Sequence, residues 1–364
     1  MTRVLVVDDS ALVRRLLRQL LADEAGFETA FAADGEEALA QLRAFRPDVV
    51  TLDINLPRMD GLTCLDRIML ERPTPVIVFS SLTAEGAAAS VEALALGAVD
   101  VLQKPSGPLS LGMSDLGAIL IEKVRAAQGV RLRGTHRLVE RVRTLTRSEQ
   151  TPDRRPRRSP LSATAEVAPR AGRLSLVLVG CSTGGPPALD ALLAPLPASF
   201  PCPIVVAQHM PATFTGPLAR RLDGICRLEV AEVTQPTPLE SGCVYVGRGD
   251  ADVVISARAQ GLLALPSPSS VDYAWHPSVD RLAWSALEAL PAPEIAGVLM
   301  TGMGGDGAEA MSALRARGGW TIAEAEETAV VWGMPGALVR MGGAAEVAPL
   351  DELAARLAAF AGAR

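Results

Sequence analysis

The sequence has few of the residues on which several classes of protein depend. Of its 364 residues only three are histidine and five are cysteine. The cysteines show no CxxC spacing, and their odd number argues against a disulfide framework. The net charge is −6, so no excess of basic residues points to a nucleic-acid partner. We therefore expect a protein of the reducing cytoplasm.

Long apolar runs are missing too. No run approaches the roughly 18 residues that a membrane-spanning helix needs. The first ten residues, MTRVLVVDDS, reach acidic side chains too early for a signal peptide. Apolar residues make up 49% of the chain and charged residues 21%, a balance typical of globular proteins. We expect two domains and no membrane insertion.

The first part of the chain alternates apolar runs with amphipathic stretches. VLVV at Val4–Val7, VVTL at Val49–Leu52 and VIVF at Val76–Phe79 are continuous apolar runs, which are typical of buried parallel strands. Between the first two, Ala11–Ala22 carries leucines at helical spacing. The alternation predicts a doubly wound parallel sheet over residues 1–125.

The character of the chain changes over residues 126–173. This stretch is rich in arginine and poor in large apolar residues, so we expect a solvated linker. Binding of its basic run to an anionic surface is the alternative.

Alternation of strands and helices resumes over residues 174–364. The strand candidates are Leu174–Val179, Ile204–Gln208, Val244–Val246, Gly297–Met300 and Thr321–Ala325. Leu228–Leu265 alternates and turns in the manner of a β-hairpin insertion. We expect a second parallel α/β domain, Rossmann-like and with that insertion.

Polar residues follow the predicted strands of the first domain. Asp8 and Asp9 follow the first strand, Asp53 follows the next, and Ser80 and Lys104 follow two others. The carboxyl ends of parallel strands meet at one edge of a sheet, so these side chains should lie together. Clustered carboxylates need a cation, and oxygen ligands suit Mg²⁺. One carboxylate could then accept a phosphoryl group, unless each aspartate only caps a helix.

Four motifs give this region a family resemblance. VLVVDDS, LDINLPRMDGL, VIVFSSLT and AVDVLQKPS make residues 3–125 resemble the receiver domain of two-component signalling, a flavodoxin-like fold. The resemblance implies that Asp53 accepts phosphate from a histidine kinase. It also implies that Asp9 and Asp53 hold Mg²⁺ with the carbonyl of Asn55, and that Asp8 assists.

The resemblance extends to the phosphoryl switch. It implies that Lys104 contacts the phosphoryl group, that Ser80 senses it, and that the Lys104–Pro105 peptide is cis. Many receivers carry an aromatic residue three positions before this lysine, where this chain has Val101. We therefore expect a switch without an aromatic rotamer change.

In the second domain, LVLVGCSTGG places a serine directly after a predicted strand. Gly180–Gly184 fits G-x-S-x-G, the nucleophile elbow, with a strand before it and a helix after it. Ser182 would be the nucleophile, and the N–H of Thr183 a natural oxyanion donor. Two alternatives remain at this point: Ser182 caps the following helix, or the turn binds a phosphate.

A second glycine motif competes with the elbow. Residues 302–307 fit G-x-G-x-x-G, and Glu324 lies about twenty residues further on, as in a dinucleotide site. However, Asp306 lies inside this loop and would repel a pyrophosphate. An aspartate there makes sense if it orients a histidine base. His209 follows a predicted strand at the same edge, whereas His276 precedes a helix and is expected to be structural or substrate-facing.

Five motifs carry a second resemblance. GCSTGGPPAL, VVAQHMPATFT, HPSVDRL, LMTGMGGDGA and WGMPGAL make the second domain resemble the catalytic domain of chemotaxis protein-glutamate methylesterases. The resemblance implies Ser182 as nucleophile, His209 as general base and Asp306 as its orienting acid. It also implies an oxyanion hole that includes the backbone N–H of Met303, with Thr183 beside the triad.

A receiver followed by this domain is that family's own architecture. It implies a phosphorylation-regulated serine hydrolase that demethylates glutamate γ-methyl esters on methyl-accepting chemotaxis receptors and deamidates receptor glutamines. A chemotaxis histidine kinase would be the phosphodonor, with Mg²⁺ for phosphorylation and no cofactor for hydrolysis. Two other classes compete with this one: a non-catalytic adaptor and an NAD(P)-binding protein.

Overall fold

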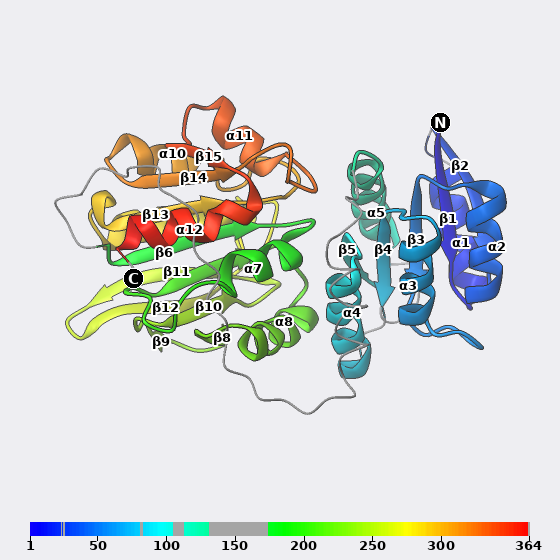
Figure 1. Cartoon of the computed structure of the whole chain (residues 1–364), viewed down its shortest axis with the longest axis horizontal. Coiled ribbons are helices and arrows are strands. Elements are labelled where there is room, and N and C mark those ends of the chain that lie inside the picture. Colours follow the sequence, from blue (N-terminus) through cyan, green and yellow to red (C-terminus); the bar gives the residue numbers. More distant parts are fainter. Residues whose placement is uncertain (23, 25, 81–82, 105–112, 131–173, 363–364) are drawn as a thin grey trace.

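A computed structural model describes residues 1–22, 24, 26–80, 83–104, 113–130 and 174–362. The chain forms two α/β domains that lie side by side (Figure 1). Most of the predicted linker, residues 131–173, lies outside the described residues. Within the described residues, no helix has the length and apolarity to cross a bilayer.

The first domain is built on a five-stranded parallel sheet of order β2-β1-β3-β4-β5. Its strands are β1 Thr2–Val7, β2 Phe27–Ala32, β3 Val49–Asp53, β4 Val76–Ser80 and β5 Asp100–Gln103. Its helices are α1 Ala11–Ala22, α2 Gly35–Phe45, α3 Gly61–Glu71, α4 Ala84–Leu96 and α5 Met113–Gln128. Side chains of α1 and α5 pack on one face, and those of α2, α3 and α4 on the other. The predicted doubly wound fold is confirmed.

The second domain is built on a seven-stranded parallel sheet of order β15-β14-β13-β6-β7-β10-β8. These strands are β6 Leu176–Cys181, β7 Ile204–Gln208, β8 Glu229–Val233, β10 Cys243–Gly247, β13 Ile295–Leu299, β14 Trp320–Glu324 and β15 Glu346–Ala348. A small antiparallel sheet adds β9 Thr237–Pro238, β11 Ala251–Arg258 and β12 Gly261–Pro268. The parallel α/β fold is confirmed. The hairpin is shorter than predicted, because β8 and β10 pair with the main sheet.

Helices cover both faces of the second sheet. They are α7 Gly185–Leu193, α8 Ala212–Ile225, α9 Val279–Ala289, α10 Ala308–Ala316, α11 Met334–Arg340 and α12 Leu350–Ala361, with a short 3₁₀ turn at Ala292–Glu294. Buried side chains of α7, α8 and α12 pack on one face, and those of α9, α10 and α11 on the other. Strand order reverses between β6 and β13, which is where open α/β sheets bind ligands.

Sequence reasoning missed α8, which contains Pro217 inside the helix. A proline normally ends a helical pattern, but here the helix is held by tertiary packing. Its residues Phe214, Leu218 and Leu222 are fully buried.

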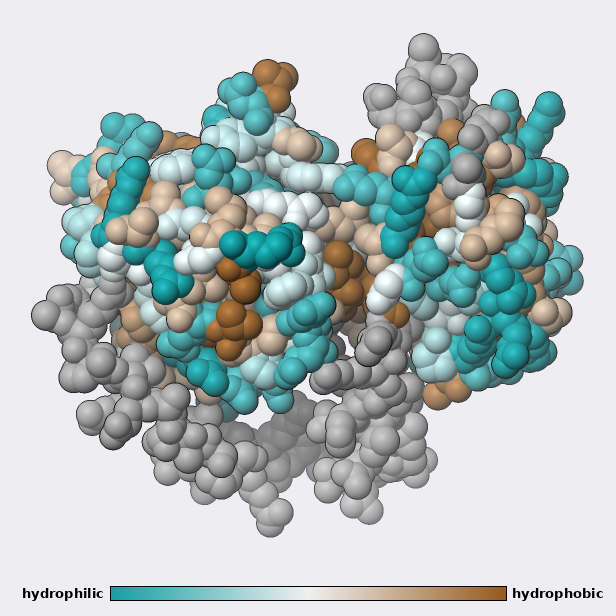
Figure 2. All heavy atoms as spheres, turned by 90° about the horizontal axis from the view of Figure 1, so that it is seen from above, coloured by the Kyte–Doolittle hydropathy of each residue, from teal (hydrophilic) through white to brown (hydrophobic). Residues whose placement is uncertain are grey.

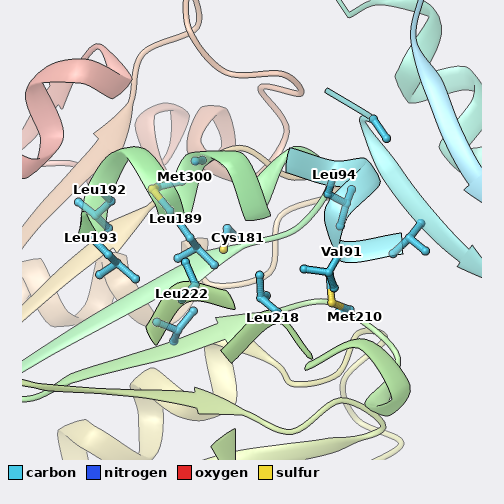
Figure 3. Close-up of a cluster of buried hydrophobic side chains, with 14 of the residues drawn as sticks. Val91, Leu94, Cys181, Leu189, Leu192, Leu193, Met210, Leu218, Leu222 and Met300 are labelled. Carbon is cyan, nitrogen blue, oxygen red and sulfur yellow. The ribbon is translucent and has the colours of Figure 1, made fainter. Parts of the chain in front are cut away.

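The two domains share an apolar contact. The receiver helix α4 packs against α7 and α8 of the second domain. Figure 3 shows Val91 and Leu94 of α4 in one buried cluster with Leu189, Met210 and Leu218. Figure 2 shows the same two lobes in contact from above. One buried hydrophobic cluster therefore continues from one domain into the other.

Candidate active site

Three strand ends meet at the switch point of the second sheet. Strands β6 and β7 are parallel and pair Cys181 with Gln208, so Ser182 and His209 both follow the last paired residues. The N–H of His209 donates to the Cys181 carbonyl at 3.0 Å. Strand β13 lies on the other side of β6 and leads into the loop that holds Asp306. The topology thus gathers the three residues that the sequence singled out.

The turn after β6 is held by backbone hydrogen bonds. The N–H of Ser182 donates to the Thr301 carbonyl at 2.9 Å, and the Ser182 carbonyl accepts from the Gly185 N–H at 2.7 Å. Gly184 takes the N-cap position of α7 at a φ of 78°, in the left-handed region that favours glycine. The alternative in which Ser182 caps this helix is therefore wrong. Its side chain remains available for chemistry.

His209 is paired with the carboxylate of Asp306. Its Nε2 lies 2.7 Å from Asp306 Oδ2. The same carboxylate accepts from the N–H groups of Val279 and Asp280 in the first turn of α9, and from the Ser278 hydroxyl. Burial alone would raise the pKa of Asp306, but the bonds from His209 and these backbone groups hold it below its usual value. Asp306 is thus an ionised partner for the imidazole.

The second ring nitrogen of His209, Nδ1, does not take part in the bond to Asp306. Among the described residues, His209 Nδ1 is buried and has no hydrogen-bond partner. No hydrogen bond joins Ser182 and His209 in the described structure, although the strand register makes them neighbours. Such bonds are often long before substrate binds. An imidazole that is fixed through Nε2 presents Nδ1 as its free basic atom.

Two backbone amides near Ser182 have no acceptor among the described residues. The N–H groups of Thr183 and Met303 donate to no other described residue. Gly302 has no room for a side chain, because a Cβ there would lie 2.9 Å from Ser182 Cβ. The loop after β13 therefore lies directly against Ser182, with the Met303 amide one residue further on.

The two acidic residues of the competing dinucleotide motif, Glu324 and Asp306, bind groups of the protein itself. Glu324 is fully buried, and its Oε2 accepts from the Thr301 N–H at 2.8 Å. Burial raises the pKa of Glu324 to about 7. Asp306 is bound to His209 and α9, as described above. Neither carboxylate is placed to receive a ribose or to leave space for a pyrophosphate.

His276 belongs to a separate polar cluster. Its Nδ1 lies 2.9 Å from Asp252 Oδ1, and Arg281 lies 2.5 Å from the other oxygen of Asp252. Asp252 is 1% exposed, so this cluster ties α9 to β11. His276 therefore has the structural role that was one of its two predicted roles.

Sequence reasoning missed two neighbours of Ser182 and His209. Trp275 stacks on His209, with ring centroids 5.8 Å apart and ring planes 13° from parallel. Gln208 places its side-chain amide beneath both Ser182 and His209. A polar residue at the end of an otherwise apolar strand, IVVAQ, was the available signal for Gln208.

In the receiver, the predicted acid cluster is assembled. Ligand oxygens of Asp8, Asp9 and Asp53 lie within 4.8 Å of one another. Lys104 Nζ lies 2.7 Å from an oxygen of both Asp8 and Asp53. The single positive charge of Lys104 does not neutralise three carboxylates. Their oxygen atoms are the hard donors that Mg²⁺ prefers.

The charges of this cluster are coupled. Burial raises the pKa of Asp53, and Asp8 adds to the effect, while Lys104 and the Asn55 N–H oppose it. Burial alone would lower the pKa of Lys104, but its hydrogen bonds to Asp53 and Asp8 raise it. Lys104 therefore stays protonated beside Asp53, the carboxylate predicted to accept the phosphoryl group.

The remaining receiver residues lie around this cluster. Ser80 is fully buried at the end of β4, and its hydroxyl donates to the Gly86 carbonyl at 3.1 Å. The Asn55 N–H donates to Asp53 at 3.1 Å. Val101 is buried within β5. The predicted cis bond between Lys104 and Pro105 lies outside the described residues.

The edge strand of the receiver lies on the turn that holds Ser182. The Gly184 N–H donates to the Val99 carbonyl at 3.0 Å. The hydroxyl of Thr183 donates to the carboxylate of Asp100. Lys123 Nζ lies 2.5 Å from the same Asp100 oxygen. Receiver atoms therefore contact the two residues that directly follow Ser182.

Comparison with known proteins agrees with this geometry. Residues 4–112 match the response regulator receiver domain family, and residues 177–357 match the CheB methylesterase family. The chain is 54% identical to protein-glutamate methylesterase/protein-glutamine glutaminase 2 of Rhodopseudomonas palustris, over 98% of this chain and 97% of that one. It is 50% identical to a protein of the same description from Rhodospirillum rubrum, over 99% and 96%.

A solved structure resembles the second domain. The CheB methylesterase catalytic domain of Thermotoga maritima has 36% identity and a TM-score of 0.50, and the match covers 51% of this chain and 98% of that one. With both domain families matched in order and relatives similar over their whole length, this chain belongs to the CheB family of protein-glutamate methylesterases/protein-glutamine glutaminases.

Proposed function

We propose that Ser182, His209 and Asp306 are the catalytic triad of this methylesterase. The observation that carries the proposal is the His209 ring, bound to Asp306 at 2.7 Å through Nε2 and left with a buried, unpartnered Nδ1. Asp306 fixes the tautomer in which Nδ1 is the base. His209 then takes the Ser182 proton as Oγ attacks the carbonyl.

The substrate is the γ-methyl ester of a receptor glutamate. Attack forms a tetrahedral oxyanion, which the backbone N–H groups of Thr183 and Met303 stabilise. The protonated His209 gives its proton to the leaving methoxide, and methanol departs. Water, activated by the same base, then releases the free glutamate from Ser182. A glutamine amide has nearly the same shape and follows the same course, with ammonia as the leaving group.

Phosphorylation of Asp53 regulates the hydrolase. Asp9, Asp53 and the carbonyl of Asn55 would hold Mg²⁺, with Asp8 assisting, and the ion would offset the charge of the entering phosphoryl group. Lys104 would contact that group, and its bond to Asp53 supports this role. Ser80, at the end of the neighbouring strand, senses it. The phosphodonor is a histidine kinase of the sensory pathway.

The receiver restrains the catalytic turn until this happens. The support is the pair of contacts from Val99 to Gly184 and from Asp100 to Thr183. Because Thr183 is also a proposed oxyanion donor, these contacts couple the position of the receiver to the site of chemistry. A new charge at Asp53 biases the packing of a two-state domain contact.

The biological role that follows is sensory adaptation. The substrates are methyl-accepting receptors, whose cytoplasmic methylation sites the enzyme would meet in the cytoplasm. Removal of methyl groups resets receptor output after stimulation. The proposed partners are therefore the receptors and their kinase.

Methanol release from methylated receptor tests the triad. Release should vanish in Ser182→Ala and fall steeply in His209→Gln. A Ser182→Ala protein that still releases methanol contradicts the proposal. For regulation, acetyl phosphate with Mg²⁺ should accelerate the wild type but not Asp53→Asn, and equal rates under those conditions would contradict control through Asp53.

A further inference from the structure

Gln208 is the last residue of β7 and lies under the catalytic turn. Its side chain is 1% exposed. Its Nε2 donates to the Ser182 carbonyl at 2.9 Å and to the His209 carbonyl at 3.0 Å. A primary amide nitrogen has two N–H groups, and both are used here. A single side chain thus binds the backbone of the proposed nucleophile and the backbone of its base.

The other end of the amide is also bound. Cys181 Sγ lies 3.0 Å from Gln208 Oε1. Burial raises the pKa of the Cys181 thiol, with a further contribution from Glu324, so the sulfur stays protonated and donates. This thiol assigns Oε1 as the acceptor and leaves Nε2 for the two carbonyls. The amide is satisfied on every side, as a buried polar group must be.

The turn after Ser182 leaves space for this side chain. A Cβ at position 185 would lie 1.9 Å from Gln208 Oε1. Any residue larger than glycine would push the amide away from the two carbonyls. This contact explains why glycine is needed at position 185, the last glycine of GCSTGG.

We propose that Gln208 is a positioning residue, which fixes Ser182 relative to His209 so that Oγ and the base meet in the reactive geometry. The inference rests on the triad proposed above and adds how the triad is held. Small misplacements of reacting groups are costly in rate even when substrate binding is intact. A side chain that bonds to both strand ends at once prevents their relative sliding.

Gln208→Met tests this role, because methionine keeps the volume and removes the bonds to both carbonyls. We expect kcat for methanol release to fall by about 10- to 100-fold, with KM within about twofold of the wild type. The assay uses the full chain with acetyl phosphate, Mg²⁺ and methylated receptor. Rates are taken per folded protein, well below the midpoint of thermal unfolding.

Thr321→Val is the matched control. Thr321 lies on β14, away from the triad, and is fully buried. Its hydroxyl donates to the Gly343 carbonyl and accepts from the Ala345 N–H. The control should lose stability and keep the wild-type kcat. If Gln208→Met also keeps the wild-type kcat, the positioning role is wrong. If it loses kcat while the control does not, a purely structural role is excluded.

Cys181 provides a second route if Gln208→Met does not fold. Cys181→Ser retains a donor to Gln208 Oε1, whereas Cys181→Ala removes it. The serine variant should keep a higher kcat than the alanine variant, and equal values would overturn the proposal. Ser182→Ala distinguishes failure of the proposed triad from failure of the positioning role. Methanol release by Ser182→Ala would contradict the triad itself. If Ser182→Ala is inactive and Gln208→Met keeps the wild-type kcat, only the role of Gln208 is contradicted.

Discussion

The two domains place their polar residues at the same part of the fold and use them differently. In the receiver, Asp8 and Asp53 crowd around Lys104, so charge holds that site together. In the hydrolase, His209 and Asp306 are held by directional hydrogen bonds to backbone and to each other. In the proposed function, the first site accepts a phosphoryl group from a kinase, and the second transfers a proton between Ser182 and His209.

Replacement of the nucleophile should have the largest effect. Ser182→Ala should lower methanol release by roughly 10⁴-fold or more, because the proposed mechanism has no other nucleophile to form the acyl-enzyme. Phosphorylation of Asp53 by acetyl phosphate should be unchanged, measured by mass spectrometry of the intact protein. Loss of both reactions together would instead indicate a global defect and contradict the separation of the two sites.

Removal of the negative charge of Asp306, which is bound to His209, should have the next largest effect. Asp306→Asn should lower kcat by about 10³- to 10⁴-fold, since an amide does not hold the reactive tautomer or stabilise the imidazolium. Because the pKa of Asp306 is below its usual value, the wild type should show no loss of this support at mildly acidic pH. Steady-state kinetics would measure the loss, and a change of less than about tenfold would contradict the orienting role.

Loss of the phosphorylation site should abolish activation rather than activity. The wild type is expected to respond to acetyl phosphate and Mg²⁺ by about 5- to 100-fold, and Asp53→Asn by no measurable factor. Basal methanol release should be the same in both. An activated Asp53→Asn protein would show that another residue takes the phosphate.

The contact between the domains should give a smaller effect of opposite sign. Asp100→Ala removes the acceptor of the Thr183 hydroxyl and should raise the basal rate by about tenfold, the lower end of what one charge-assisted hydrogen bond contributes. Glu71→Ala is the matched control, because Glu71 pairs with Arg43 and Arg67 on the receiver surface. An unchanged basal rate in Asp100→Ala would mean that this contact does not restrain the turn.

The buried carboxyl of Glu324 should affect stability with little effect on rate. Its folded pKa, about 7, lies above the ordinary 4.5, so its contribution to stability is complete below pH 4.5 and is lost as pH rises through 7. The loss is on the order of 3 kcal/mol. Glu324→Gln can still accept from the Thr301 N–H and should flatten this dependence, measured as Tm from pH 5 to pH 8. An equally steep profile in the variant would contradict the assignment.

The sequence was most informative where charged residues follow several predicted strands. Asp8, Asp9, Asp53 and Lys104 could be placed together from strand order alone, because parallel strands bring their carboxyl ends to one edge. The fold class followed from continuous apolar runs, while α8 was hidden by the proline inside it. Leu228–Leu265 alternates like a hairpin insertion, yet its strands β8 and β10 join the main sheet.

The candidate active site was harder to predict, because it depends on the strand register of β6 and β7 and on hydrogen bonds to backbone groups. Ser182, His209 and Asp306 could be named as candidates from the sequence, but the bond between Asp306 and His209 is visible only in the folded structure. Gln208 gave no signal beyond its polarity. Its importance depends on two carbonyls and a thiol that only the folded turn brings within 3.0 Å.

The most direct test is the rate at which a small serine-reactive phosphonate labels the protein, with the labelled peptide identified by mass spectrometry. The structure predicts a label on Ser182, faster with acetyl phosphate and Mg²⁺ in the wild type and unaccelerated in Asp53→Asn. Labelling of another residue would contradict Ser182 as the nucleophile. If Ser182 is labelled at the same rate with and without phosphorylation, the proposed restraint of the Ser182 turn by the receiver is contradicted.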